Sequence, residues 1–488
     1  MALALGTNGV RGLFDELHPA AAMDFGYAFA QFVKKHPREN AGAKARENRE
    51  RPLAALARDM RATSPCISQA VAAGLMEGGC DVLDIGIATS PMAEWANGNY
   101  GCDGLVIVTA SHNPPQWNAL KFVDGDGVAV SRQRGADMAR WVGKPHAPAL
   151  EWQQIGRTID APDAIGEYKK AVLAFVDRKA IAKKKRWKIV ADVGNGTSTL
   201  VAPALFRALG ADVVVLNEKL DGSFPGRPSE PTEGNVKALI EAVPREGADF
   251  GVAYDGDADR VVFVDGRGRW LVGDKCVALA AQWALQTMEK GGKAPKGRKP
   301  ETQTDEKFVV TTVATSRVVE DVAAKHGAKI EYTDVGAPYL AERMRALGRK
   351  VVSGGEEVGG IVWPRFSLAK DGVLAACKLM EMVAIKPLAE WHDELPRYYN
   401  SKTKIACKKG ENARLVARLL ADVKTEKTGK NRLREVQGGF RLDMGDSWVL
   451  ARASGTEDFI RVFAESPDEE KAVSLMNEYK VRVEKTRI

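Results

Sequence analysis

The sequence has few cysteines, Cys66, Cys80, Cys102, Cys276, Cys377 and Cys407, and none of them belongs to a CxxC pair. Scattered cysteines support neither a disulfide framework nor a zinc ribbon, and they are typical of the reducing cytoplasm. Long apolar runs are also missing, because none approaches the roughly 20 residues of a membrane-spanning helix. The N-terminus lacks a basic start, so we expect no signal peptide. We therefore expect a cytoplasmic protein without a membrane partner.

Aromatic residues are absent from the two most basic stretches, residues 34–61 and 290–307, which carry much of the excess positive charge of a chain with net charge +7. Nucleic-acid binding usually combines basic patches with aromatic side chains or a recognition motif. Neither is found here, so we expect no nucleic-acid partner. We predict solvated surface loops at both stretches, including Arg58 and Arg61. The positive balance is compatible with an anionic substrate.

A length of 488 residues is too great for one hydrophobic core and suggests about three domains. Short apolar runs alternate with helical patterns, which predicts an α/β fold with largely parallel, helix-covered sheets. The last hundred residues instead show hairpin-like alternation and a closing helix at 466–485, which indicates a smaller α+β domain. We expect a linker at 143–163 and a helix at 197–209. The expected domains are residues 1–155, 156–268, 269–390 and 391–488.

Thr109-Ala110-Ser111-His112-Asn113-Pro114 follows an apolar run that predicts a buried strand. A serine on the tight turn after a strand is held rigidly with its hydroxyl exposed, which suits a nucleophile or phosphoryl carrier. A polar turn with a capping serine is the alternative interpretation of this stretch taken alone.

Asp255-Gly256-Asp257-Ala258-Asp259-Arg260 places three carboxylates at alternate positions between two apolar strands. Bare carboxylates that converge in a tight loop repel one another, and a hard cation such as Mg²⁺ resolves that conflict. An EF-hand is excluded, because Arg260 stands where its loop requires Gly and Gly266 where it requires Glu. An acidic turn open to water is the alternative.

Three further stretches carry weaker signals. Gly355-Glu356-Glu357-Val358-Gly359-Gly360 combines a flexible backbone with carboxylates that can bind sugar hydroxyls, or it is a turn with solvated glutamates. Arg452-Ala453-Ser454-Gly455-Thr456-Glu457, with Arg461 beyond it, makes a phosphate cradle or a hairpin turn with surface arginines. The third stretch is Gly6-Thr7-Asn8-Gly9-Val10-Arg11-Gly12, for which a simple terminal turn is the alternative.

Together and in this order, these stretches, with Asn118 and Lys121, resemble the α-D-phosphohexomutase superfamily from Gly6 to Arg461, and the Glu-Glu-x-Gly-Gly form resembles archaeal-type members. The resemblance implies a heart-shaped protein with three α/β domains and a smaller, differently folded fourth domain. It also implies a Mg²⁺-dependent reaction that interconverts hexose 1-phosphate and hexose 6-phosphate through a phosphoserine and a hexose 1,6-bisphosphate, which also serves as activator. The expected partner is a small hexose phosphate, and the chain is expected to be a monomer or homodimer.

The resemblance also assigns roles to individual residues. The expected catalytic residues are Ser111, His112, Lys121, Arg11 and Arg260; the metal ligands are Ser111, Asp255, Asp257 and Asp259; the sugar contacts are Glu356 and Val358; and the phosphate contacts are Arg452, Ser454, Gly455, Thr456 and Arg461. Lys121, with a pKa lowered by nearby cations and metal, would take the proton of the attacking hydroxyl.

Some positions depart from the family pattern. Many relatives have Ser or Asn where Val358 stands, and some have His at the positions of Gly360 and Ala337. The preferred hexose therefore stays open among glucosamine, mannose and glucose. Two other functions also stay open: a metal-dependent sugar-phosphate phosphatase and a non-catalytic sugar-phosphate sensor.

Overall fold

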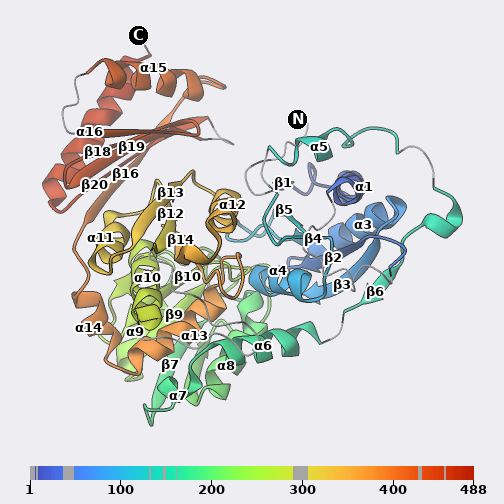
Figure 1. Ribbon diagram of the computed structural model, residues 1–488, viewed down its shortest axis with the longest axis horizontal. Helices are drawn as coiled ribbons and strands as arrows, with labels where there is room; N and C mark the ends of the chain where they lie inside the picture. The colour runs from blue at the N-terminus through green and yellow to red at the C-terminus, as the bar shows by residue number, and fades with distance from the viewer. Residues whose placement is uncertain are drawn as a thin grey trace.

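A computed structural model describes residues 6, 9–36, 49–130, 133–146, 150–161, 163–289, 306–426, 431–454 and 458–487. The chain forms four domains, each built on its own sheet: three are α/β and the C-terminal one is α+β (Figure 1). In Figure 1 the first domain lies on the right and the fourth at the upper left, with the second and third between them. Within the described residues, no helix is both long and apolar enough to cross a membrane.

The first domain has a six-stranded sheet in the order β1-β5-β4-β2-β3-β6. Apolar side chains of α1 and α3 cover one face, and α4 packs against the other, so both faces of the sheet are buried. Its elements are β1 (Val10–Leu13), α1 (Pro19–Lys35), β2 (Leu53–Arg58), α3 (Ser64–Glu77), β3 (Asp81–Ile87), α4 (Ser90–Asn99), β4 (Gly104–Val108), β5 (Trp117–Asp124), α5 (Ala136–Ala139), η1 (Trp152–Gln154) and β6 (Thr158–Asp160).

The second domain has a five-stranded sheet in the order β11-β10-β9-β7-β8, and the third a four-stranded sheet in the order β13-β12-β14-β15. The second contains α6 (Ala164–Phe175), α7 (Arg178–Ile181), β7 (Trp187–Asp192), η2 (Thr197–Leu200), α8 (Ala202–Ala208), β8 (Ala211–Leu216), α9 (Lys237–Arg245), β9 (Phe250–Tyr254), β10 (Val261–Asp265) and β11 (Trp270–Leu271). The third contains α10 (Gly273–Glu289), β12 (Phe308–Thr312), α11 (Arg317–Lys325), β13 (Lys329–Thr333), α12 (Ala337–Leu347), η3 (Gly348–Lys350), β14 (Val351–Glu356), β15 (Gly360–Val362), α13 (Gly372–Val383) and α14 (Leu388–Asp393).

One connection recurs in the first three domains. The strands β4, β9 and β14 each run parallel to an inner neighbour and are followed directly by an antiparallel partner, β5, β10 and β15 respectively. The loop at this turn carries the serine motif in the first domain, the aspartate motif in the second and the Gly355–Gly360 motif in the third. The three most informative motifs therefore occupy the same topological position.

The fourth domain is an antiparallel sheet in the order β16-β20-β19-β18-β17, covered by two helices. Its core is separate, whereas one continuous apolar core joins the first three domains. Alternate residues of β19 face opposite ways, so Trp448 and Leu450 pack on Val313 and Ala314 of the third domain. Its elements are β16 (Tyr399–Ala406), α15 (Asn412–Thr425), β17 (Arg432–Val436), β18 (Gly439–Met444), β19 (Ser447–Ala453), β20 (Phe459–Ser466) and α16 (Glu469–Lys485).

Three expected elements differ in the structure. The expected linker contains β6, which pairs in parallel with β3. The expected helix at 197–209 is split into η2 and α8, because Pro203 lacks an amide hydrogen and sits in the first turn of a new helix. The closing helix begins at Glu469 rather than at 466, since the Asp468 side chain caps it by accepting from the Lys471 amide at 2.8 Å.

Two glycines allow α1 and α3 to cross closely. A Cβ at Gly74 would lie 2.1 Å from the Met23 carbonyl oxygen, and one at Gly26 would lie 2.4 Å from the Val71 carbonyl oxygen. No real side chain tolerates such distances to rigid backbone. The first domain therefore depends on glycine at the crossing point of these two helices.

We expect Gly74→Ala to lower the free energy of unfolding by at least about 1–3 kcal/mol, because the methyl group forces the two helices apart. The matched control is Gly98→Ala in α4, where a Cβ would meet nothing within 4 Å and which should gain about 0.4–1 kcal/mol from reduced unfolded-state entropy. Urea unfolding of both variants checks this. Equal stabilisation by the two substitutions would contradict the packing argument.

Candidate active site

Ser111 lies in the turn between β4 and β5 and is 3% exposed. Its φ of +51° is in the left-handed region, which is rare for a residue with a side chain and is found where the surroundings enforce it. The Oγ donates a hydrogen bond of 2.6 Å to Oδ2 of Asp255 in the second domain. The serine hydroxyl thus points at the aspartate loop and is buried there, so the exposed hydroxyl predicted from the motif is not found.

Arg61 holds the serine loop in place. Its guanidinium donates hydrogen bonds to four carbonyl oxygens of the loop and its exit: those of Ser111, Asn113, Pro114 and Trp117. Its Nε donates to the Asp59 carboxylate at 2.9 Å, and the residue is only 1% exposed. The prediction of a solvated surface arginine was wrong here, because a buried guanidinium collects the carbonyl groups that a sharp turn leaves unpaired. Residues 37–48 of the same basic stretch, and residues 290–305 of the second, lie outside the described part of the chain.

The carboxylates of Asp255, Asp257 and Asp259 converge between β9 and β10. One oxygen from each lies within 4.8 Å of the others, and all three residues are buried. Burial, with the charges of Asp257 and Asp259, raises the pKa of Asp255 well above its usual value. Oδ1 of Asp257 and Oδ1 of Asp259 are buried without a hydrogen-bond partner. The loop therefore presents oxygen atoms whose bonding is incomplete.

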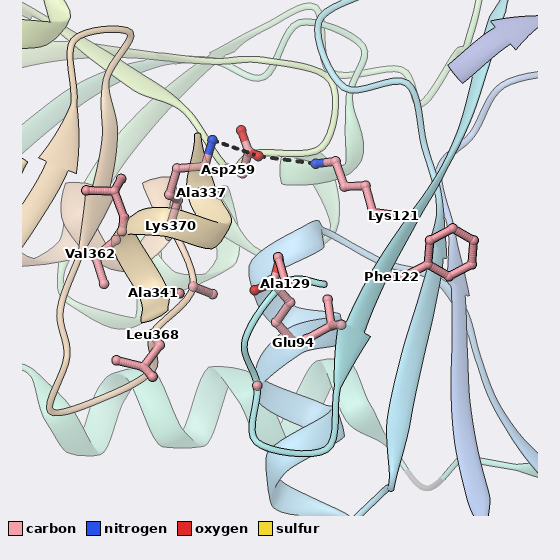
Figure 2. Close-up of a pocket in the computed structure, with 14 residues that line it drawn as sticks. Glu94, Lys121, Phe122, Ala129, Asp259, Ala337, Ala341, Val362, Leu368 and Lys370 are labelled. Atoms are coloured by element: carbon pink, nitrogen blue, oxygen red, sulfur yellow. Dashed lines mark hydrogen bonds and ion pairs between the residues drawn. The ribbon is translucent and has the colours of Figure 1, made fainter. Parts of the chain in front are cut away.

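Two lysines from other domains approach this cluster. Lys121 Nζ on β5 lies 2.6 Å from Oδ2 of Asp257 and 3.2 Å from Oδ2 of Asp259. Lys370 Nζ, which precedes α13, approaches the same Asp259 oxygen at 3.2 Å (Figure 2). Burial alone would lower the pKa of Lys121, but Asp257 and Asp259 outweigh it and raise the pKa. The expected lowering of this pKa is therefore not found in this arrangement.

His112 and Arg11 lie on the serine side of the site. Burial, with the charges of Arg260 and Arg11, lowers the pKa of His112 to about 2, so its ring is neutral at physiological pH. Arg11 donates from a terminal guanidinium nitrogen to the Asn113 side chain at 2.7 Å. Arg260 donates its amide to Asp255 Oδ1 at 3.2 Å and pairs with Glu230 at 3.2 Å. Lys121 and Arg260 thus contact the aspartate loop, whereas Arg11 contacts the serine loop, which also carries His112.

The Gly355–Gly360 loop packs against the aspartate loop through backbone contacts. The Val261 amide donates to the Gly359 carbonyl at 3.0 Å, and the Gly372 amide donates to the Ala258 carbonyl at 3.1 Å. Glu356 is 6% exposed and accepts from Lys370 at 2.6 Å. Val358 lies at the tip of the turn and is half-buried. The second and third domains are thus joined directly where their motifs lie.

The fourth domain contributes a pair of arginines. Arg452 and Arg461 stand directly opposite each other on β19 and β20, where like charges are unfavourable. Burial and Arg461 lower the pKa of Arg452, and Nε of Arg461 is buried without a partner. Ser454 directly follows β19, whereas Gly455 and Thr456 lie outside the described residues. Neither arginine forms an ion pair with a described residue, and such a pair of cations at one end of a sheet is suited to an anion.

A cavity lies between the first and third domains, next to the aspartate loop and its two lysines. Lys121, Asp259 and Lys370 form one side of it, and the Glu94 carboxylate points into it from α4 (Figure 2). Burial raises the pKa of Glu94 to about 8. Sequence reasoning missed Lys370, Glu94 and Ser90, whose hydroxyl donates to Asp257 at 2.6 Å. Ser90 alone had a local signal, since it follows a helix-capping threonine.

Family comparisons match all four domains. Residues 2–141, 166–268 and 272–399 match "Phosphoglucomutase/phosphomannomutase, alpha/beta/alpha domain" I, II and III, and residues 393–480 match the C-terminal domain of the same family. The chain belongs to the phosphoglucomutase/phosphomannomutase family.

Relatives in this family match nearly the whole chain. A "Phosphoglucomutase/phosphomannomutase" of Thermococcus kodakarensis is 39% identical over 97% of this chain and 96% of its own. A "Phosphoglucosamine/phosphogalactosamine mutase" of Sulfurisphaera tokodaii is 32% identical over 99% and 100%. The crystal structure of a phosphoglucomutase/phosphomannomutase family protein from Burkholderia thailandensis superposes with a TM-score of 0.81 at 22% identity, covering 99% of this chain and 97% of that one. These findings support a phosphohexomutase function.

The residues present fit a divalent cation in this phosphoglucomutase/phosphomannomutase family member. The donor set consists of carboxylate and hydroxyl oxygens only, which favours a hard ion such as Mg²⁺. The unpartnered oxygens of Asp257 and Asp259 are available to it. A carboxylate with a raised pKa, Asp255, must lose its proton before it can act as a ligand.

We expect Mg²⁺ affinity to rise with pH over a range that begins above the ordinary pKa of an aspartate. The reason is that the raised pKa of Asp255 keeps the ligand protonated to higher pH. Calorimetric titration in two buffers of different ionisation enthalpy measures the proton release. Asp257→Asn should weaken binding by about 10-fold or more, while the control Asp221→Asn, in a loop outside the site, should not. Proton-independent binding that survives Asp257→Asn would place the cation elsewhere.

Proposed function

We propose that the protein is a Mg²⁺-dependent phosphohexomutase that interconverts hexose 1-phosphate and hexose 6-phosphate. The observation that carries this proposal is the 2.6 Å contact between the Ser111 hydroxyl and Asp255, within a buried cluster of three carboxylates. A serine hydroxyl so placed is suited to carry a phosphoryl group that exchanges with a sugar hydroxyl. The reaction class is phosphoryl transfer, which depends on positioning and charge neutralisation.

In this proposal phosphorylated Ser111 transfers its phosphoryl group to the free hydroxyl of a hexose phosphate. A new P–O bond forms to the sugar, the P–O bond to Ser111 breaks, and a hexose 1,6-bisphosphate results. The other phosphate of that bisphosphate then returns to Ser111. Arg11 and Arg260 stabilise the negative charge of the transferred group. His112, which is neutral, orients by hydrogen bonding rather than by charge.

Mg²⁺ on Asp255, Asp257, Asp259 and the seryl phosphate would supply charge neutralisation at the transferred group. Lys121 is the proposed proton acceptor for the attacking hydroxyl. Pairing with Asp257 and Asp259 raises the pKa of Lys121 and keeps it protonated in the present arrangement, so in this proposal it can accept a proton only after it leaves those carboxylates and loses its own proton.

The proposed sites for the two ends of the substrate lie in different domains. Glu356, with Val358 at the loop tip, faces the sugar, and Arg452, Arg461 and Ser454, with Gly455 and Thr456, hold the phosphate that is not being transferred. Because this phosphate group alternates between C1 and C6, one cradle must accept two sugar orientations. The separate core of the fourth domain supports such movement.

The proposed substrates are glucosamine, mannose or glucose phosphates. The names of the relatives from Sulfurisphaera tokodaii and Thermococcus kodakarensis refer to amino sugars and to neutral hexoses, respectively. A panel of hexose 1-phosphates with a trace of the matching 1,6-bisphosphate identifies the preferred one.

We expect Ser111→Ala to reduce turnover of every hexose 1-phosphate to below about one thousandth of the wild-type rate, because the carrier oxygen is lost. Intact-mass measurement should show a phosphoryl group on the wild-type chain that substrate removes, and none on the variant. Stoichiometric release of inorganic phosphate would instead indicate a hydrolase. Substantial mutase activity in the variant would overturn the proposed carrier.

A further inference from the structure

Lys370 is a buried lysine that the motifs do not include. It lies between β15 and α13 and is only 7% exposed, with its side chain directed into the cavity between the first and third domains (Figure 2). Its neighbour Asp371 caps α13 and accepts the Tyr168 hydroxyl at 2.7 Å. The contacts of Asp371 therefore anchor the backbone next to Lys370.

The ammonium group of Lys370 joins two loops. It donates to Oε1 of Glu356 at 2.6 Å and lies 3.2 Å from Oδ2 of Asp259. Within the described residues only Oε1 of Glu356 accepts a hydrogen bond, so the other carboxylate oxygen can still accept one from a ligand. One cation thus orients the proposed sugar-binding carboxylate relative to the proposed metal ligand.

The chain makes room for this pair at Gly360. A Cβ there would lie 2.4 Å from Cδ of Lys370 and 3.1 Å from Cγ of Glu356. Gly360 faces Glu356 across the β14–β15 ladder, and its φ is not left-handed, so backbone conformation does not require glycine. The absent side chain is instead explained by the space that the Lys370–Glu356 pair occupies.

We propose that Lys370 is a positioning residue that holds Glu356 toward the sugar and ties the sugar loop to the aspartate loop. This inference rests on the proposed function, since it gives Glu356 its sugar-binding role. Loss of Lys370 leaves the Glu356 side chain buried without the partner that orients it. The defect is therefore one of sugar binding rather than of metal binding.

The test is a double-substitution cycle with Lys370→Met and Glu356→Gln, assayed on the preferred hexose 1-phosphate. Each single variant should raise KM by about 10-fold or more, with a smaller effect on kcat. The KM of the double variant should be no higher than that of the more impaired single variant, because both substitutions remove the same function. Additive effects would overturn the proposal.

Magnesium affinity should not fall in Lys370→Met, because removing a cation beside Asp259 favours a metal ion there. A loss of metal affinity in this variant would also count against the proposal.

The matched control is Lys378→Met. Lys378 is another buried lysine, paired with Glu381 at 2.7 Å but packed against Phe175 and Trp363 away from the cavity. Lys378→Met should lower the stability of the protein without changing KM. A rise in KM equal to that of Lys370→Met would show that breaking any buried ion pair is enough to raise KM. Gly360→Ala provides a second variant that displaces the pair sterically and should reproduce the KM effect if Lys370→Met fails to fold.

A failure of the proposed function is separable from a failure of this inference. If the wild-type protein turns over no hexose phosphate, calorimetric binding of mannose 1-phosphate and of inorganic phosphate decides the question. Lys370→Met should weaken the first by about 10-fold and leave the second unchanged. Equal weakening of both, or no binding of mannose 1-phosphate by the wild-type protein, would overturn the role of Lys370.

Discussion

The repulsion among three buried carboxylates in one short loop is the constraint on which the site depends. Asp255, Asp257 and Asp259 lie too close together and too far from water to be charged without compensation. The compensating side chains come from other parts of the chain: Lys121 from the first domain and Lys370 from the third. The charged groups that prepare a cation site thus also hold side chains of three domains together at the aspartate loop.

The topology explains why these domains meet there. The serine loop, the aspartate loop and the Gly355–Gly360 loop each join a parallel strand to its antiparallel neighbour, so each motif stands at the same edge of its sheet. The apolar core that joins the first three domains holds these edges together. The fourth domain has its own core and attaches to the third through a small apolar patch and through polar contacts, among them hydrogen bonds from Arg441 to the carbonyl groups of Val313 and Thr315. A rigid reaction centre and a separately packed phosphate cradle follow from this division.

The sequence predicts the parts of the site that are contiguous in the chain. The serine and aspartate motifs can be recognised in the sequence, because their functional side chains lie at short spacing next to apolar strands. Arg61 was mispredicted because a run of basic residues looks the same whether one member is buried or all are solvated. Lys370 has no local signal at all, since its role comes from a partner on another loop and from the space left by Gly360. Residues whose function arises from tertiary contact carry no pattern in a single sequence.

Backbone strain is concentrated around the same point. Among the described residues, five that are not glycine have positive φ, and two of these are asparagines, which tolerate it. The other three are Ser111, Ala258 and Phe224, whose ring lies beneath the Arg61 guanidinium at 5.1 Å. Each costs about 1–2 kcal/mol, and such a conformation persists only where its surroundings impose it. Here the hydrogen bonds of Arg61 and the interdomain contacts of the aspartate loop impose this strained conformation. The stability of the surrounding fold thus keeps the serine oxygen and the carboxylates close to one another.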